Sequence, residues 1–169
     1  MKFPPYIVFS VLAPLLSGCA LLPAPANDAP AVDMSFLVKP GQLLPLTKLN
    51  DITGEHVVLN TPGRKKLVIL FATWCADSQR AMKALHQSPL IQDKSLDIVA
   101  IAREQQNTEL ASWAAENEIK VTLVADADRS IYRQFAHAGI PRFIMVDEQN
   151  RIVETVLAEG EQQIEHIRW

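Results

Sequence analysis

One cysteine stands where a redox motif would need two. The segment Trp74-Cys75-Ala76-Asp77-Ser78 has the spacing of a Cys-x-x-Cys pair, in which the first sulfur attacks and the second resolves the mixed disulfide. Ser78 takes the place of the second sulfur. We therefore expect Cys75 to act as a nucleophile, with Trp74 and Ser78 beside it, and any resolving sulfur to come from another molecule.

The chain's other cysteine, Cys19, ends a segment typical of export signals. Lys2 is followed by an apolar stretch over 6–16, too short to span a bilayer as a helix. Leu16-Ser17-Gly18-Cys19 resembles the lipobox of bacterial lipoproteins, which implies cleavage and lipidation at Cys19. The alternative is an ordinary signal peptide cut after Ala24-Pro25-Ala26, with Cys19 discarded.

Three regions follow from these patterns: a lipoprotein signal peptide over 1–19, an Ala- and Pro-rich linker over 20–34 and a folded domain over 35–169. The chain of 169 residues is 49% apolar and 21% charged, which favours one domain with a real core. Its formal charge of −3, without a basic run, argues against a nucleic-acid partner. Lipid on Cys19 would hold the domain to a membrane, and Ala20 after it implies the outer membrane.

Positioning Cys75 requires a strand before it and a helix after it. The run Leu67–Phe71 is apolar on both faces, as in a central, covered strand. The motif then begins a helix that Pro89 should stop. Cys75 would thus lie at a helix start, where unpaired N–H groups stabilise a thiolate.

The remaining elements alternate between strands and helices. Strands are expected over 96–101 and 121–125, and helices capped by Asn107 and by Asp128, the second ending at Gly139. Hairpins are expected at each end, from strands over 44–49 with 56–60 and over 143–146 with 152–157. Such an order predicts an α/β sandwich with a mixed sheet.

Three segments together resemble the thioredoxin fold. They are Phe71-Ala72-Thr73-Trp74-Cys75 after a buried strand, Gly139-Ile140-Pro141 before another, and the turn over 147–152. They are more narrowly similar to the TlpA/ResA group of exported, membrane-tethered thiol-disulfide oxidoreductases. The resemblance covers about 44–160 and implies a three-layer sandwich with a central mixed sheet and an N-terminal β-hairpin.

The resemblance also implies roles around Cys75. Pro141 would be cis, facing the sulfur, and the backbone of Ile140 would pair with an extended substrate peptide. The alternative is a trans proline starting an edge strand. The family's buried acid in the strand before the motif is replaced by Ile69.

Two features of the motif have opposite effects on a Cys75 thiolate. The Ser78 hydroxyl could donate a hydrogen bond to it. The Asp77 carboxylate would disfavour it. The sequence does not rank the two.

Three functions are consistent with these residues. Cys75 could exchange disulfides on exported proteins, with a small thiol or partner protein completing the cycle. The domain could instead hold cysteine-containing partners without redox turnover, or act as a one-cysteine peroxidase. The last is least favoured, because peroxiredoxins have a threonine and a proline where this chain has Ala72 and Val68.

No cofactor or metal is expected. The four histidines show no paired spacing with Cys75, and soft-metal sites use several thiolates or imidazoles. We accordingly expect a domain in the periplasm of a Gram-negative cell envelope, anchored by lipid. Its partners would be thiol- or disulfide-containing exported proteins or a small thiol.

Overall fold

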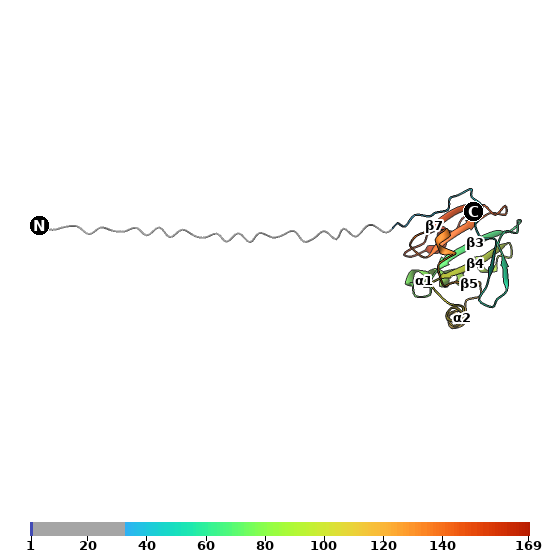
Figure 1. Cartoon of the computed structure of the whole chain (residues 1–169), viewed down its shortest axis with the longest axis horizontal. Helices are drawn as coiled ribbons and strands as arrows, with labels where there is room; N and C mark the ends of the chain where they lie inside the picture. The colour runs from blue at the N-terminus through green and yellow to red at the C-terminus, as the bar shows by residue number, and fades with distance from the viewer. Residues whose placement is uncertain (2–32) are drawn as a thin grey trace. The chain divides into compact units, whose positions relative to one another are not determined.

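The computed structural model describes residues 33–169, together with Met1 (Figure 1). The predicted signal peptide, Cys19 and nearly all of the predicted linker lie outside these residues. Among the helices that are described, none combines the length and apolar character needed to cross a bilayer.

A mixed five-stranded sheet forms the centre of the domain (Figure 1). Its strands are β3 (Lys65–Phe71), β4 (Leu96–Arg103), β5 (Thr122–Asp126), β6 (Arg142–Val146) and β7 (Ile152–Leu157). They are arranged in the order β5-β4-β3-β6-β7. The pairs β3–β4 and β4–β5 are parallel, whereas β3–β6 and β6–β7 are antiparallel. The prediction of a mixed sheet is therefore confirmed.

β3 is the central strand because its side chains are apolar on both faces. Leu67, Ile69 and Phe71 join one buried cluster, and Val68 and Leu70 join the other. A strand covered on both sides needs this continuous apolar pattern. Cys75 comes four residues after the strand's end, at the edge where the parallel strands end.

Two helices cover one face of the sheet. α1 (Ala76–Gln87) packs Met82 and Leu85, and α2 (Asn107–Glu116) packs Leu110, into the cluster that contains Ile69. α1 ends two residues before Pro89, as expected, and a 3₁₀ helix, η1 (Pro89–Gln92), follows. The N-cap of α2 is Gln106 rather than the predicted Asn107.

The opposite face is covered mainly by the N-terminal part of the domain. β1 (Lys48–Asn50) and β2 (His56–Val58) form the predicted hairpin as a separate antiparallel pair. Both strands are shorter than predicted, because the flanking Leu44, Leu46 and Leu59 lie in the core rather than in the hairpin. Helices, sheet and this N-terminal layer make the three layers of the predicted sandwich.

The helix predicted after Asp128 is wrong as an α-helix. Only a 3₁₀ helix, η2 (Tyr132–Gln134), forms there. The carboxylate of Asp126 accepts the N–H groups of Ile131 and Tyr132, at 3.0 and 2.8 Å, and Arg129 adopts a positive φ of 63°. A regular helix starting at 128 would require helical backbone angles at Arg129 and different partners for these N–H groups.

The C-terminal hairpin joins β6 to β7, with Asn150 in the left-handed region at a φ of 61°. After β7 the chain crosses back to α1 through a short 3₁₀ helix, η3 (Gln163–His166). The indole of Trp169 donates to the carbonyl of Val146 at 3.1 Å.

Candidate active site

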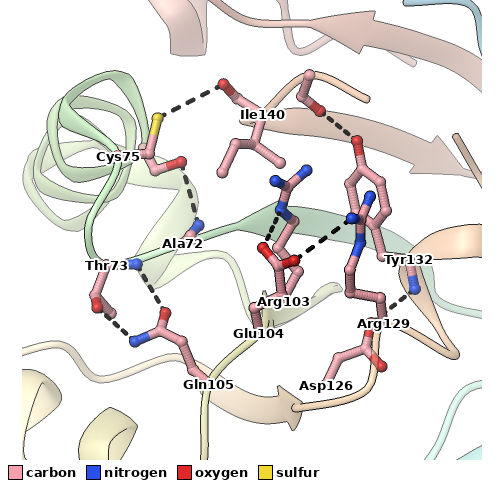
Figure 2. A network of polar contacts seen from close by, with 12 residues as sticks. Ala72, Thr73, Cys75, Arg103, Glu104, Gln105, Asp126, Arg129, Tyr132 and Ile140 are labelled. Atoms are coloured by element: carbon pink, nitrogen blue, oxygen red, sulfur yellow. Dashed lines mark hydrogen bonds and ion pairs between the residues drawn. The ribbon is translucent and has the colours of Figure 1, made fainter. Parts of the chain in front are cut away.

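Cys75 occupies the N-cap position of α1, where the chain turns from β3 into the helix. Its side chain is partly exposed, and no side chain caps the first turn. The thiol donates to the carbonyl of Ile140, with sulfur and oxygen 3.7 Å apart (Figure 2). The helix N-terminus places partial positive charge beside the sulfur.

The residues facing Cys75 form the cis-proline loop, which we define as residues 139–141. The Ile140–Pro141 bond is cis, so that prediction is confirmed. Gly139 has a φ of 84°, and a Cβ on it would lie 2.5 Å from the methyl carbon of Met34. Its carbonyl accepts the Tyr132 hydroxyl at 2.7 Å. The loop is therefore held rigidly against the sulfur.

Ser78 lies inside the protein, directly behind the site. It is 0% exposed, and its Oγ accepts the N–H of Ala72 at 3.3 Å. The expected bond from its hydroxyl to Cys75 is absent among the described residues. Ser78 lies in the first turn of α1, and its bond to Ala72 connects this turn to the chain before Cys75 without a hydrogen bond to the Cys75 sulfur.

Asp77 is directed toward the C-terminal segment. Its Oδ1 accepts the N–H of Gly160 at 3.1 Å and pairs with Arg80, while its main-chain oxygen accepts the amide of Gln163 at 3.3 Å. The carboxylate is therefore engaged in holding α1 to the segment after β7. The sequence did not indicate this role.

Trp74 lies on the surface next to Cys75. Its side chain is 57% exposed, and the guanidinium carbon of Arg103 lies 5.4 Å from its ring centre. This placement excludes a plain core role. The ring instead forms an exposed aromatic surface at the mouth of the site.

Gln105, which the sequence reasoning missed, clamps the chain just before the motif. Its Oε1 accepts the N–H of Thr73 at 2.8 Å, and its Nε2 donates to the Thr73 hydroxyl at 2.5 Å (Figure 2). Gln105 is 5% exposed. The signal that could have found it is its position just after β4, beside the strand that precedes Cys75.

A second missed group is a charged network at the ends of β4 and β5. Arg103 and Arg129 share the carboxylate of Glu104, with separations of 3.3 and 3.4 Å. Both guanidinium groups lie over the ring of Tyr132, at 4.9 and 5.3 Å from its centre (Figure 2). This network connects Trp74 on one side of the site to Tyr132 on the other.

Two further polar residues lie close to Pro141 in the chain, and neither forms a hydrogen bond with Cys75. The buried side chain of Arg142 donates to the carbonyls of Ala138, Gly139 and Met34. His137 is exposed. Within the residues that the structure describes, no three metal-binding side chains cluster.

The arrangement of a nucleophilic thiol at a helix start, opposite a cis-proline loop, defines a thioredoxin-like domain. Residues 40–155 match the model of the AhpC/TSA family, and the chain belongs to this family. No curated protein sequence matches it.

Solved structures share the fold at low identity. A candidate protein disulfide isomerase from Bacteroides thetaiotaomicron has a TM-score of 0.71 at 19% identity, covering 78% of this chain and 87% of its own. A secreted disulfide oxidoreductase from Mycobacterium tuberculosis scores 0.61 at 16% identity, covering 70% and 89%. A peroxiredoxin-like protein from Aquifex aeolicus scores 0.62 at 9% identity, covering 73% and 80%. Identities this low establish the shared fold alone.

Proposed function

We propose that the chain is a membrane-tethered thiol-disulfide exchange protein of the TlpA/ResA type that uses Cys75 as its only nucleophile. The observation that carries the proposal is the contrast between the two motif positions. Cys75 is accessible, starts α1 and lies 3.7 Å from the carbonyl before the cis-proline. Ser78, at the second position, is buried and cannot form a disulfide. Similar structures described as disulfide oxidoreductases support this chemistry.

The exchange cycle balances with two equivalents of an external thiol. The Cys75 thiolate attacks one sulfur of a substrate disulfide, so that a mixed disulfide forms and the substrate's other sulfur leaves as a thiolate. A first external thiolate displaces the remaining substrate sulfur and becomes bonded to Cys75. A second external thiolate then attacks the first, which releases an external disulfide and the Cys75 thiolate. The substrate is reduced, and two external thiols are oxidised.

The cis-proline loop would orient the substrate in the first step. An extended peptide can pair with the backbone of Ile140, which places a peptide sulfur next to Cys75. Thiol- or disulfide-containing exported proteins are therefore the expected partners, together with the small thiol of the later steps.

The test is disulfide turnover by the purified domain. A peptide disulfide is incubated with an excess of a small thiol, with and without the domain, and Cys75→Ala serves as the control. We expect the wild type to accelerate peptide reduction and to yield a mixed disulfide after acid trapping, both lost in Cys75→Ala. Wild-type rates equal to those of the control would exclude the exchange reaction.

A redox-inactive binding module is the second candidate, and the exposed ring of Trp74 favours it. In that case a cysteine-containing peptide would bind equally well to wild type and Cys75→Ser, and binding would weaken in Trp74→Ala. Binding that depends on the Cys75 sulfur would instead agree with exchange.

One-cysteine peroxidase chemistry is a third candidate, which the family and the Aquifex aeolicus structure bring into consideration. The residue three before Cys75 is Ala72, which has no hydroxyl to bind a peroxide. We expect no Cys75-dependent consumption of hydrogen peroxide above that of a free thiol.

The lipid anchor forms part of the same proposal. Cys19 would carry the acyl chains, and residues 20–34 would let the domain stand off the membrane in the periplasm of a Gram-negative cell, with the outer membrane favoured by Ala20. Metabolic labelling with a fatty acid tests this. Label should appear on the wild type and be lost in Cys19→Ala; label that persists in the variant would exclude Cys19 as the anchor.

A further inference from the structure

The guanidinium of Arg103 lies between the two sides of the Cys75 site. Its Cζ is 5.4 Å from the ring centre of Trp74, which precedes Cys75, and 4.9 Å from that of Tyr132. The hydroxyl of Tyr132 in turn holds Gly139 at the start of the cis-proline loop. Arg103 therefore lies next to the space where a partner of Cys75 must enter.

The two ends of this guanidinium have different surroundings. Nε is buried and lies 3.3 Å from the Glu104 carboxylate as an ion pair without a hydrogen bond, whereas the terminal nitrogens form neither kind of contact within the described residues. Figure 2 shows them extending away from Glu104 toward Ile140. The Arg103 side chain is 15% exposed, so it is oriented by its neighbours yet remains open at its donor end.

The carboxylates nearby do not bond to this donor end. Glu104 is shared between Arg103 and Arg129. Both oxygens of Asp126 accept backbone N–H groups at the start of η2, including that of Tyr132. Each guanidinium contacts a different oxygen of Glu104, and the terminal nitrogens of Arg103 have no acceptor among the described residues.

We propose that Arg103 binds a carboxylate carried by the thiol or disulfide partner of Cys75. This rests on the proposed exchange function and names its substrate class as carboxylate-bearing thiols. A guanidinium offers two parallel N–H donors that match the two oxygens of a carboxylate. Stacking against Trp74 and Tyr132 fixes the plane of these donors before the partner arrives.

The test compares two alkylating reagents of similar size, one charged and one neutral, whose intrinsic rates are calibrated on the unfolded chain. Iodoacetate is an anion and iodoacetamide is neutral, and both consume the same Cys75 thiolate. The ratio of their rates therefore cancels any change in the amount of thiolate and reports the charge around the sulfur. The ratio is measured in the folded protein and in the urea-unfolded chain, which has no site.

The folded wild type should show a higher ratio than the unfolded chain. Arg103→Gln should lower it three- to tenfold, equivalent to about 0.7–1.4 kcal/mol, while Arg103→Lys should keep most of it. Lys120→Gln is the matched control. It removes an exposed cation just before β5, at the end of the parallel strands opposite to the end where Cys75 lies. It should leave the ratio unchanged.

A second measurement identifies where the carboxylate comes from. A mixed disulfide on Cys75 is resolved with 3-mercaptopropionate or with neutral 2-mercaptoethanol, and separately with cysteine peptides that carry Glu or Gln beside the cysteine. An Arg103-dependent preference among the small thiols assigns the site to the resolving thiol. A preference confined to the peptides assigns it to the protein substrate.

If the ratio of the iodoacetate rate to the iodoacetamide rate is the same in folded and unfolded wild type, the proposal is overturned, and no variant is needed to show it. An unchanged ratio in a folded Arg103→Gln protein would overturn it as well. Neither outcome concerns disulfide turnover, so the exchange function would survive it. Conversely, a charge-selective Cys75 that never turns over disulfides would leave the carboxylate site intact and exclude the exchange function.

Discussion

The clamp that Gln105 forms on Thr73 should stabilise both the fold and the position of Cys75. Two hydrogen bonds connect these side chains and the Thr73 backbone, at 2.8 and 2.5 Å. A typical internal hydrogen bond contributes about 0.5–1.5 kcal/mol net. Gln105→Ala removes both bonds and should cost about 2 kcal/mol of the free energy of unfolding.

A matched variant separates the two bonds. Thr73→Val keeps the backbone N–H that donates to Gln105 and removes only the hydroxyl, so it should cost about 1 kcal/mol. In the double variant the hydroxyl bond is already absent. The double variant should therefore lose about 1 kcal/mol less unfolding free energy than the sum of the losses in the two single variants, as expected for residues in direct contact.

Urea unfolding of the four proteins, with a common m-value, measures these free energies. The same proteins are assayed for reduction of a peptide disulfide and for alkylation by iodoacetamide. We expect Gln105→Ala to slow peptide reduction more than alkylation, because only the peptide requires Cys75 to be positioned against the cis-proline loop. Full additivity, or an unchanged unfolding midpoint in Gln105→Ala, would refute the clamp.

Three other predictions concern single side chains. Ser78→Cys should give a dithiol protein that forms an internal disulfide with Cys75, detectable as the loss of both free thiols on mild oxidation; persistence of both thiols would show that the buried position cannot reach Cys75. Asp77→Ala should lower the unfolding free energy by about 1 kcal/mol, because a charge-assisted bond to the Gly160 N–H is lost from a partly exposed site; an unchanged urea midpoint would contradict this. Burial lowers the pKa of Lys66 in the folded protein, so the unfolded chain binds the ammonium proton more firmly. The free energy of unfolding should therefore rise with pH between the lowered folded-state pKa and the ordinary lysine pKa. Lys66→Met should flatten that rise in urea titrations at several alkaline pH values.

The parts of the fold that follow from local pattern could be predicted from the sequence. The apolar run Leu67–Phe71 identified the central strand, and Pro89 the end of α1. The cis bond before Pro141 came from a resemblance rather than from any local physical signal. Each of these depends on residues close together in the chain or on a family motif.

The failed helix after Asp128 shows the limit of local reasoning. Asp128 and the apolar Ile131 and Phe135 have helical spacing, but the N–H groups there bond to Asp126 at the end of β5. A side chain on the neighbouring strand end thus replaces the helix's own capping. Only the folded position of β5 reveals this competition.

The contacts around Cys75 could not be predicted without knowing the register of the sheet. Parallel pairing sets Phe71 opposite Ala102, so the residues that follow each strand meet. Thr73 then contacts Gln105, although 32 positions separate them in the chain. The sequence gives the residue types, but nothing local specifies which residue after β4 faces the motif.

The different depths of the two motif positions determine how resolution must occur. A second sulfur at position 78 would attack from inside the protein, where Ser78 is fully buried. Without it, the attacking thiolate has to arrive through the accessible side, past the exposed ring of Trp74 and the cis-proline loop. Arg103 lies along this path, with its free donors directed toward Ile140. Because position 78 is a serine, the mixed disulfide on Cys75 must be resolved from the accessible side, where Arg103 carries a positive charge. We therefore expect the charge of the external thiol to control the rate of resolution.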